Sequence, residues 1–566
     1  MPRIASGQNA DLDDLRARVE RLEQENRELR AAQTAPSRAE FAPPQAPDQT
    51  TIDALVDQRL AEREAEKKQQ EEQKKQEAAE QGYVIGSDLS AKARFKDGLF
   101  PWIETPHKDF TLHISCWTQL DNVWWAESAG LYQKLTIVGT NPINAGPAQG
   151  VASGPLLGGI GDLQDGVFMR RIRPNFEGTF WENGEYRIIP ALENNQFNTA
   201  GIDEMWVGAR DIPVVGTVRI GHVKTPMGLE ADMTASSRAM TFMERSSYSE
   251  AIELNQNFVT GLWLGDALFD QRMTWSLACF RPDVKASTDA FFGDGQAGVQ
   301  ARLTGLPLYE IEGRHLLHVG LSGGWRNGTV ANLNNIDVRT VQLSARPELR
   351  DDVPGGGGVP NSNSNRMVDT GLIASDRIWL MGLEALYIRG PLSLQAEYGW
   401  NWLDNAVGVI NANTPKVLNA FAAPQGYMFN GGYAQLAYTL TGENRAYDRR
   451  GGTLAREYFG KSGPYNRAWI VRDGAGHWLW NSGAWEVACR YSYVNLNSGL
   501  GGPYPIQGGI MDGVSVGLNW YLNNNLTLNL DWSYDNRRHL PAGADAASTV
   551  QPGYTNGFGA RVQLQF

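Results

Sequence analysis

Arginines gather in the stretch VFMRRIRPNFEGTF, residues 167–180. If this stretch is a β-strand, one face carries Arg171, Arg173, Asn175, Glu177 and Thr179, and the other carries Phe168, Ile172, Phe176 and Phe180. Rings of arginine lower the barrier to anions in a pore, and a planar guanidinium group can bind phosphate oxygens through two hydrogen bonds. Strict alternation places Arg170 on the aromatic face, so Arg170 needs a β-bulge or a strand end to join the arginine face.

Other residues that could do chemistry lack the context that the chemistry needs. The run GLSGG, residues 320–324, fits the nucleophile motif of hydrolases but lies in a strand-like stretch with no helix after it. His315 and His318 in that stretch point to opposite faces, so they do not form a metal pair. The glycines 355–358 lack the lysine and the strand–helix context of a nucleotide-binding loop. We expect no catalytic residue, no metal and no cofactor, and we do not expect an enzyme.

Composition and charge narrow the class of protein. The chain of 566 residues is 42% hydrophobic and contains 62 Gly and 18 Trp, which is typical of an all-β protein with many turns. No run reaches the roughly 18 consecutive apolar residues of a transmembrane helix. The net charge of −12 argues against a nucleic-acid partner. Cys116, Cys279 and Cys489 lie among apolar neighbours and are interpreted as small apolar side chains.

The first 82 residues differ in kind from the rest. The stretch 11–31 repeats residues at two heptad positions, with Leu12, Val19 and Asn26 at one and Leu15, Leu22 and Leu29 at the other. We interpret residues 1–33 as a coiled coil in which Asn26 sets the register, and a single solvated helix is the alternative. Residues 34–50 form a Pro-rich linker and residues 51–82 a charged helical spacer. The N-terminus has no apolar segment of the kind found in signal peptides.

From residue 83 to residue 566 the pattern changes to short alternating strands. The stretch LTLNLDWSYDN, for example, places Leu526, Leu528, Leu530, Trp532 and Tyr534 on one face. Aromatic residues cluster at the ends of the apolar faces, and short turns alternate with long Gly- and Asn-rich loops. These features predict an all-β fold, a transmembrane antiparallel β-barrel of about 16 strands, preceded by the α-helical coiled coil.

The sequence ends on the alternating run GFGARVQLQF, residues 557–566. We interpret it as the last strand of a closed barrel that pairs with the first strand. Its apolar face, from Phe558 to Phe566, would contact lipid. Arg561, Gln563 and Gln565 would face water in the pore.

Several stretches carry a resemblance to a known family. The most specific are YAQLAYTLTGENRAYDRR (433–450) and GAWEVACRYSYV (483–494), and four others support them: VFMRRIRPNFEGTFW (167–181), VRIGHVKTPMGLE (218–230), SSRAMTFMERS (236–246) and VSVGLNWYLNNNLTLNLDWSY (514–534). Together they resemble the phosphate-selective porin O and P family of trimeric outer-membrane channels, over roughly residues 110–566. The resemblance implies a 16-stranded barrel, constricted by an inward-folded third loop, in which anions cross along a ladder of arginines. The terminal Phe566 itself resembles the aromatic end that the barrel-assembly machinery of outer membranes recognises.

The resemblance also implies which residues line the pore. The constriction and anion-binding residues would be Arg170, Arg171, Arg173, Asp203, Ser236, Ser237, Arg238 and Arg245, and the outer anion ladder Arg339, Arg346 and Arg350. The lysine that the family pattern places near the constriction is absent, because the chain continues ADMTASSR after GLE. The first lumen strand carries His113, Ser115, Trp117 and Gln119 where the family tends to have an arginine. These departures favour a general or weakly anion-selective pore, and each arginine has an alternative role as an ion pair in the barrel wall.

We therefore predict an outer-membrane porin that passes small hydrophilic solutes by diffusion, with a preference for anions, phosphate among them. Its partners would be outer-membrane lipid, further copies of itself in a homotrimer, and the cell wall, reached by the periplasmic coiled coil. A second hypothesis is a structural anchor, in which the coiled coil tethers the membrane to the cell wall or another envelope layer. A third is a soluble β-sandwich that binds carbohydrate through exposed tryptophans.

Overall fold

The computed structural model describes most of the chain from residue 86 onwards. The described residues are 86, 88–94, 101–132, 160, 163–192, 200–232, 239–253, 258–281, 296–333, 336–350, 366–411, 416–455, 458–459, 468, 471–472, 476–479, 481–538 and 552–565. The predicted coiled coil with Asn26, the linker and the spacer lie outside them, as do Ser236, Ser237, Arg238 and Phe566.

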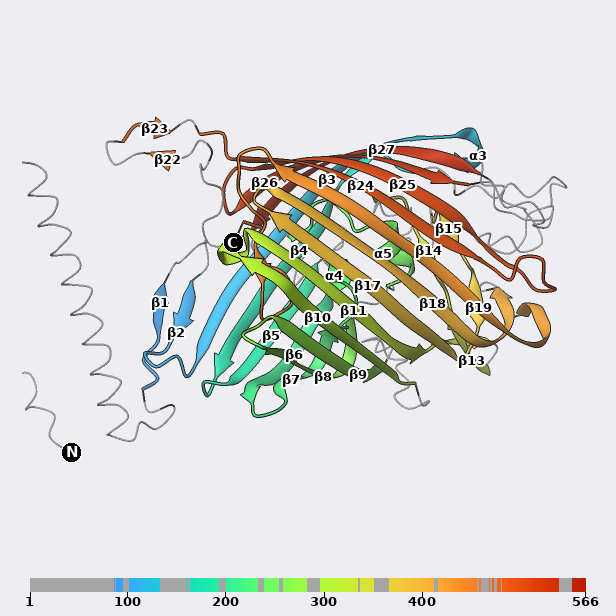
Figure 1. The fold of residues 1–566 in the computed structure, drawn as a ribbon, viewed down its shortest axis with the longest axis horizontal. Coiled ribbons are helices and arrows are strands. Elements are labelled where there is room, and N and C mark those ends of the chain that lie inside the picture. The colour runs from blue at the N-terminus through green and yellow to red at the C-terminus, as the bar shows by residue number, and fades with distance from the viewer. Residues whose placement is uncertain are drawn as a thin grey trace, which may run out of the picture. The chain divides into compact units, whose positions relative to one another are not determined.

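Sixteen strands of the described chain form a closed antiparallel barrel (Figure 1). Each strand pairs with its neighbour in chain order, and the ring closes where β27 pairs with β3, from Thr555↔Glu127 to Gln565↔Trp117. The predicted pairing of the last strand with the first is confirmed, and closure leaves no edge strand exposed. The barrel strands are β3 (Thr111–Glu127), β4 (Gly166–Phe180), β5 (Gly184–Leu192), β6 (Ala200–Ile212), β7 (Gly216–Lys224), β8 (Phe258–Leu268), β9 (Met273–Arg281), β10 (Gly298–Glu310), β11 (His315–Asn327), β17 (Arg377–Arg389), β18 (Leu392–Asn411), β19 (Lys416–Thr439), β24 (Ala484–Ser498), β25 (Ile506–Tyr521), β26 (Leu526–Arg537) and β27 (Gly553–Gln565).

The two ends of the barrel have connections of different length. At one end, here called the turn side, most connections are short: 181–183, 213–215, 269–272, 311–314, 390–391 and 522–525. At the opposite end, the loop side, they include 128–165, 225–257, 282–297 and 328–376. The predicted asymmetry is confirmed, with exceptions at both ends: the turn-side connection 440–483 is long and the loop-side connection 412–415 is short. In outer-membrane barrels in general, the short turns lie on the periplasmic side and the long loops on the outer side.

Smaller elements lie before the barrel and in its connections. They are the strands β1 (Lys92–Arg94), β2 (Trp102–Glu104), β12 (Thr329–Leu333), β13 (Ile336–Val341), β14 (Ser344–Ala345), β15 (Val368–Asp369), β16 (Leu372–Ala374), β20 (Tyr447–Asp448), β21 (Thr453–Leu454), β22 (Val471–Arg472) and β23 (Trp478–Leu479), the helices α3 (Ala129–Tyr132), α4 (Leu229–Asp232) and α5 (Ser247–Ala251), and the 3₁₀ turn η2 (Ile311–Gly313). None of the described helices is long and apolar enough to cross a membrane.

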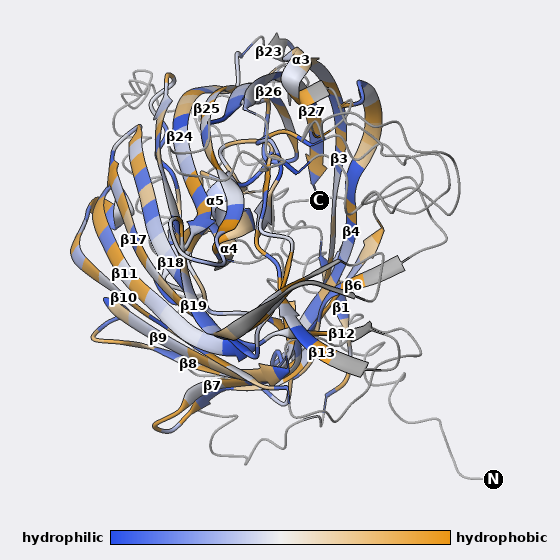
Figure 2. Ribbon diagram, turned by 90° about the vertical axis from the view of Figure 1, so that its right-hand side faces the viewer, coloured by the Kyte–Doolittle hydropathy of each residue, from blue (hydrophilic) through white to orange (hydrophobic). Residues whose placement is uncertain are grey.

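Alternation along the strands gives the barrel an apolar outer face. On β26, Leu530 and Trp532 are about two-fifths exposed, whereas Asp531 and Ser533 are buried inside. Figure 2 shows the same alternation as bands of hydrophobic and hydrophilic colour along the strands. A transmembrane strand needs this pattern, because its outer side chains contact hydrocarbon and its inner ones contact the lumen.

The largest apolar cluster lies inside the ring of strands. It joins Tyr248 and Ile252 of the connection 225–257, Leu343 of the connection 328–376, and the inward side chains Ile378 of β17 and Phe429 of β19. Two loop-side connections therefore fold inwards and cover part of the inner wall. Along this part of β17 both faces are apolar, one towards the membrane and one towards the inward-folded segments.

Candidate functional site

The connection between β7 and β8, residues 225–257, is here called the inner loop. As the resemblance implies, this third loop-side connection folds into the barrel, where Figure 2 shows α4 and α5 inside the ring. Its side chains Phe242, Met243 and Tyr248 are buried. Ser246 caps α5, because its hydroxyl accepts a hydrogen bond from the backbone N–H of Ser249 at 3.3 Å. The described parts of the inner loop are thus packed against the wall.

Glu244 of the inner loop is the meeting point of four guanidinium groups. Arg170 donates from Nε and Nη2 to the two carboxylate oxygens at 2.8 and 3.0 Å. Arg561 donates at 2.9 Å and Arg171 at 3.4 Å, and Arg350 lies 3.6 Å away. Although burial favours the neutral acid, the nearby arginines, Arg170 first among them, hold the pKa of Glu244 well below its usual range.

A β-bulge on β4 brings both Arg170 and Arg171 to this point. The pairing with β3 shifts between Gln119, which faces Arg171, and Leu120, which faces Met169, so Arg170 is the extra residue. The predicted need for a bulge at Arg170 is confirmed, and both arginines are buried on the lumen side.

The same bulge corrects one sequence prediction. Phe168 was expected on the outer face with Ile172, but it is buried at 2% exposure and its neighbour Val167 is the exposed residue. An extra residue in a strand reverses the alternation beyond it, because the side-chain period is two. The aromatic face of β4 therefore ends at the bulge.

Residues on β3 and β27 support the arginine cluster from behind. Arg561 donates to both carboxylate oxygens of Asp121, at 2.7 and 2.6 Å, and also to the backbone carbonyl of Met243. Arg171 donates to the side-chain amide oxygen of Gln119 at 2.7 Å. Gln119 in turn donates to Gln563 at 2.6 Å. The predicted inward orientation of Arg561 and Gln563 is confirmed, but both side chains are bonded to other residues and buried.

The other predicted constriction residues lie in separate contacts. Arg173 forms an ion pair with Asp203 across the lumen face of the wall. Arg245 donates from Nε to the backbone carbonyl of Glu230 at 3.3 Å.

Two of the three predicted outer rungs reach the inner loop. Arg346 pairs with Glu250 at 3.0 Å. Arg350 lies 3.4 Å from Glu250 and 3.6 Å from Glu244, so it bridges the two carboxylates. Arg339 instead pairs with Asp376, the residue before β17. The connection 328–376 thus contributes cations to the same cluster as the barrel wall.

A second buried ion pair holds the inner loop and was missed in the sequence. Arg490 of β24 is 1% exposed and donates to Glu348 at 2.8 Å, to Glu230 at 3.4 Å and to the Glu244 backbone carbonyl at 3.1 Å. Despite its burial, Glu348 keeps a pKa below its usual range because Arg490 lies beside it. In the stretch ACRYSYV, alternation places Arg490 and Ser492 on the same inner face, and this pattern could have indicated a charged residue inside the barrel.

The start of the inner loop is fixed by a carboxylate of the wall. Glu397 of β18 accepts hydrogen bonds from the backbone amides of Leu229 and Glu230, the latter at 2.8 Å, and from the Tyr433 hydroxyl at 2.5 Å. Gly228 precedes them with φ +70°, and a Cβ there would lie 1.7 Å from Glu253 Oε1. Only glycine fits this close approach without displacing Glu253.

The long turn-side connection reaches the inner loop from the opposite end. Arg445 donates to the Ala239 backbone carbonyl and to the Thr241 hydroxyl. Farther along, Arg302 of β10 donates to the Gly452 carbonyl at 2.9 Å. The inner loop is therefore held from the wall, from the loop side and from the turn side.

Within the described residues, no group of His, Cys, Asp or Glu side chains is arranged to hold a metal ion.

A closed barrel with an apolar outer face, a charged inner face and an inward-folded loop defines a channel of the outer-membrane porin class. The family described as phosphate-selective porin O and P matches residues 159–566, and the chain belongs to this family. Its location is the outer membrane. Members of the family are channels rather than enzymes.

Two relatives show how far the similarity extends. Porin O of Pseudomonas aeruginosa is 27% identical over 386 residues, which cover 64% of this chain and 75% of that protein. An uncharacterised protein of Caulobacter vibrioides is 25% identical over 407 residues, which cover 71% of this chain and 68% of that protein.

Among solved structures, the outer-membrane channel DcaP of Acinetobacter baumannii has a TM-score of 0.41 at 10% identity, over 83% of this chain and 100% of that one. OmpF of Salmonella typhi also has a TM-score of 0.41, at 12% identity, over 81% and 99%.

Proposed function

We propose that the chain forms a water-filled diffusion channel for small hydrophilic solutes, and that arginines around the inner loop give it a preference for anions. The observation that carries this proposal is the cluster at Glu244. Among the described residues, five guanidinium groups lie within ion-pair distance of three carboxylates, and the members are Arg170, Arg171, Arg346, Arg350 and Arg561 with Asp121, Glu244 and Glu250. Such a local excess of positive charge lowers the barrier for anions although the whole chain is acidic.

Phosphate belongs among the proposed solutes for a chemical reason. A guanidinium group presents two parallel N–H donors, which match two oxygens of a phosphate group. Arg350 is the candidate for a first contact, because it belongs to a loop-side connection and its side chain remains about a quarter exposed. Arg170 and Arg171, both buried, would act through the electric field of the cluster.

Reversal potentials test the anion preference. Replacing Arg350 by alanine removes one charge of the cluster, and a unit charge at about 4 Å in water is worth about 1 kcal/mol, so we expect the chloride-to-potassium permeability ratio to fall about fivefold. The measurement is the zero-current potential of single channels in a KCl gradient, repeated after addition of phosphate.

The matched control for this experiment is Arg389→Ala. Arg389 lies at the turn-side end of β17 and is exposed, so its loss removes the same charge away from the cluster. Equal potentials for the wild type and Arg350→Ala would contradict the proposed site. A barrel that inserts but stays silent in the bilayer would favour the structural anchor instead.

We also propose that three copies assemble into a homotrimer and that residues 1–33 form a periplasmic coiled coil that reaches the cell wall. The heptad pattern with Asn26 supports this arrangement, since such an asparagine sets the number and register of helices. Cross-linking of the full-length protein in outer-membrane vesicles is expected to give a species of three chains. If cross-linking gave only single chains, the homotrimer would be contradicted. If the cross-linked protein were recovered without attached peptidoglycan, the contact of the coiled coil with the cell wall would be contradicted.

A further inference from the structure

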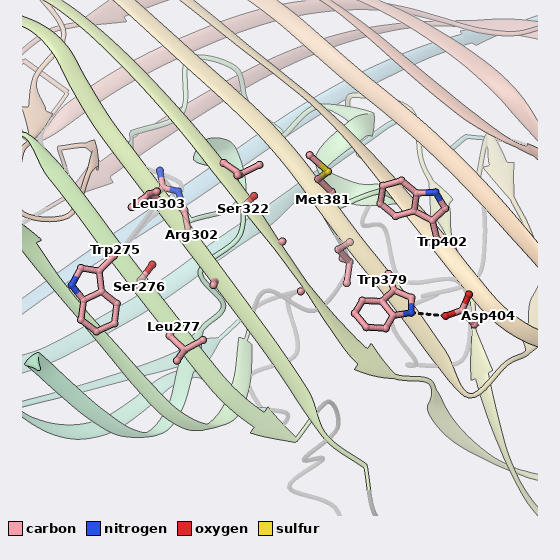
Figure 3. Close-up of a pocket in the computed structure, with 15 residues that line it drawn as sticks. Trp275, Ser276, Leu277, Arg302, Leu303, Ser322, Trp379, Met381, Trp402 and Asp404 are labelled. Atoms are coloured by element: carbon pink, nitrogen blue, oxygen red, sulfur yellow. Dashed lines mark hydrogen bonds between the residues drawn. The ribbon is translucent and has the colours of Figure 1, made fainter.

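A large apolar groove lies on the outer face of the barrel, across strands β9 to β18 (Figure 3). Its volume is about 980 Å³. The side chains that border it include Leu303, Leu321 and Met381, which are between about two-fifths and one-half exposed. These residues alternate with buried ones on their strands, so they belong to the face that contacts the membrane.

The groove exists because two small residues stand side by side. Ala301 of β10 pairs directly with Gly323 of β11. Their next neighbours in the same row are larger, Leu277 of β9 on one side and Met381 of β17 on the other. A methyl group and a hydrogen atom therefore form the floor, and the longer side chains form the borders.

Towards the loop side, the groove reaches a row of three tryptophans, and two of them, Trp379 and Trp402, line it. Trp325, Trp379 and Trp402 are successive partners across β11, β17 and β18. The rings of Trp325 and Trp379 lie 6.5 Å apart. Tryptophans concentrate at the level of lipid headgroups, so this row marks the outer membrane–water interface.

Arg377 stands at this interface, two residues before Trp379 on β17. Its guanidinium carbon lies 4.9 Å from the Trp325 ring centre and 5.7 Å from that of Trp379. Its Nε atom is buried and has no hydrogen-bond partner among the described residues. Asp404, the residue that pairs with Arg377 on the neighbouring strand β18, instead accepts a hydrogen bond from Trp379 Nε1 at 2.6 Å (Figure 3). Arg377 is thus a cation at the membrane–water interface, held over two tryptophan rings.

We propose that this surface, Arg377 with the groove below it, binds a phosphorylated, acylated lipid of the outer leaflet. An acyl chain lies in the groove over Ala301 and Gly323, and the phosphate group accepts hydrogen bonds from Arg377. The chemistry selects this occupant because a groove open to the membrane fills with hydrocarbon, and an Arg guanidinium group favours phosphate. The site is separate from the lumen and independent of the proposed anion preference.

Lipid binding to the detergent-purified full-length protein tests the proposal. Native mass spectrometry would compare bisphosphorylated lipid A with the same lipid after removal of its phosphates. Arg377→Ala is expected to weaken binding of lipid A at least about tenfold, the value of one charge-assisted hydrogen bond, and to leave binding of the dephosphorylated lipid unchanged. Ala301→Trp, which fills the groove, is expected to weaken both.

Matched controls separate the outcomes of this experiment. Arg389→Ala removes an exposed arginine from the other end of β17 and should bind lipid A like the wild type. Inorganic phosphate alone should not displace the lipid. Unchanged lipid A binding by Arg377→Ala would overturn the proposal. A change of oligomeric state in Ala301→Trp, with lipid binding unaltered, would overturn it in favour of a second copy of the chain as the occupant.

Discussion

Replacing Glu244 by glutamine is expected to make the channel markedly more selective for anions. The variant keeps the shape of the side chain and removes the charge shared by Arg170, Arg350 and Arg561. Because these groups are largely buried, the lost charge is screened less than at a surface, and we expect the chloride-to-potassium permeability ratio to rise roughly tenfold. Zero-current potentials in a KCl gradient measure the change directly.

The pH dependence of the wild-type channel provides an independent test of the same group. The pKa of Glu244 is held well below its usual range, so the carboxylate stays charged at neutral and mildly acid pH. Its stabilising contribution is present above the pKa of the unfolded chain and is lost as the pH falls through the depressed native pKa. The difference in anion selectivity between the wild type and Glu244→Gln should therefore persist in mildly acid buffer and disappear only in strongly acid buffer.

A neutralised glutamate elsewhere gives the matched control for Glu244→Gln. Glu312 in η2 is exposed on the turn side, and Glu312→Gln removes one negative charge at a position that is not part of the cluster. Selectivity equal to that of the wild type is expected for this control. If Glu244→Gln behaved in the same way, the cluster would not govern ion passage.

Replacing Arg490 by methionine is expected to cause the largest loss of stability. Arg490 is buried between Glu348 and Glu230 and lies over the Phe242 ring at 4.5 Å. Removing one partner of a buried ion pair leaves the other charges uncompensated, which costs about 3–5 kcal/mol. The measurement is thermal unfolding of the detergent-solubilised barrel, followed by circular dichroism.

Two comparisons separate the charge effect from loss of packing. In the double variant Arg490→Met with Glu348→Gln, a large part of the lost stability should return, because fewer buried charges lack a partner. Without Arg490, burial raises the pKa of Glu348, so Arg490→Met should also recover stability as the pH falls. Equal instability of the single and double variants at every pH would point to packing alone.

The sequence predicted the barrel because the alternation of period two survives in nearly every wall strand. The run around Leu530 and Trp532 shows it clearly, and so does the pairing of the last strand with the first. The bulge at Arg170 followed from the same reasoning, since two adjacent arginines cannot share a face in a regular strand. The predicted outward orientation of Phe168 was wrong because the prediction continued the alternation past that bulge.

The partners of the inner loop could not be predicted from local pattern. Glu244 and Arg561 are 317 residues apart, and no periodicity relates them. Arg346 and Arg350 depend on how the connection 328–376 folds inwards, which strand alternation does not determine. The sequence contained a hint that segments fold inwards: the run RIWLMGLEALYI is largely apolar on both faces, which indicates a strand covered on both sides.

The contacts of Glu244 have a consequence for assembly. The carboxylate binds Arg170 on β4, near the start of the barrel, and Arg561 on β27, the last strand. Arg561 reaches Glu244 from β27, the strand whose pairing with β3 closes the ring. An incompletely closed barrel therefore holds its inner loop by fewer bonds than a finished one. The contacts of Glu244 thereby link closure of the ring to the position of the inner loop.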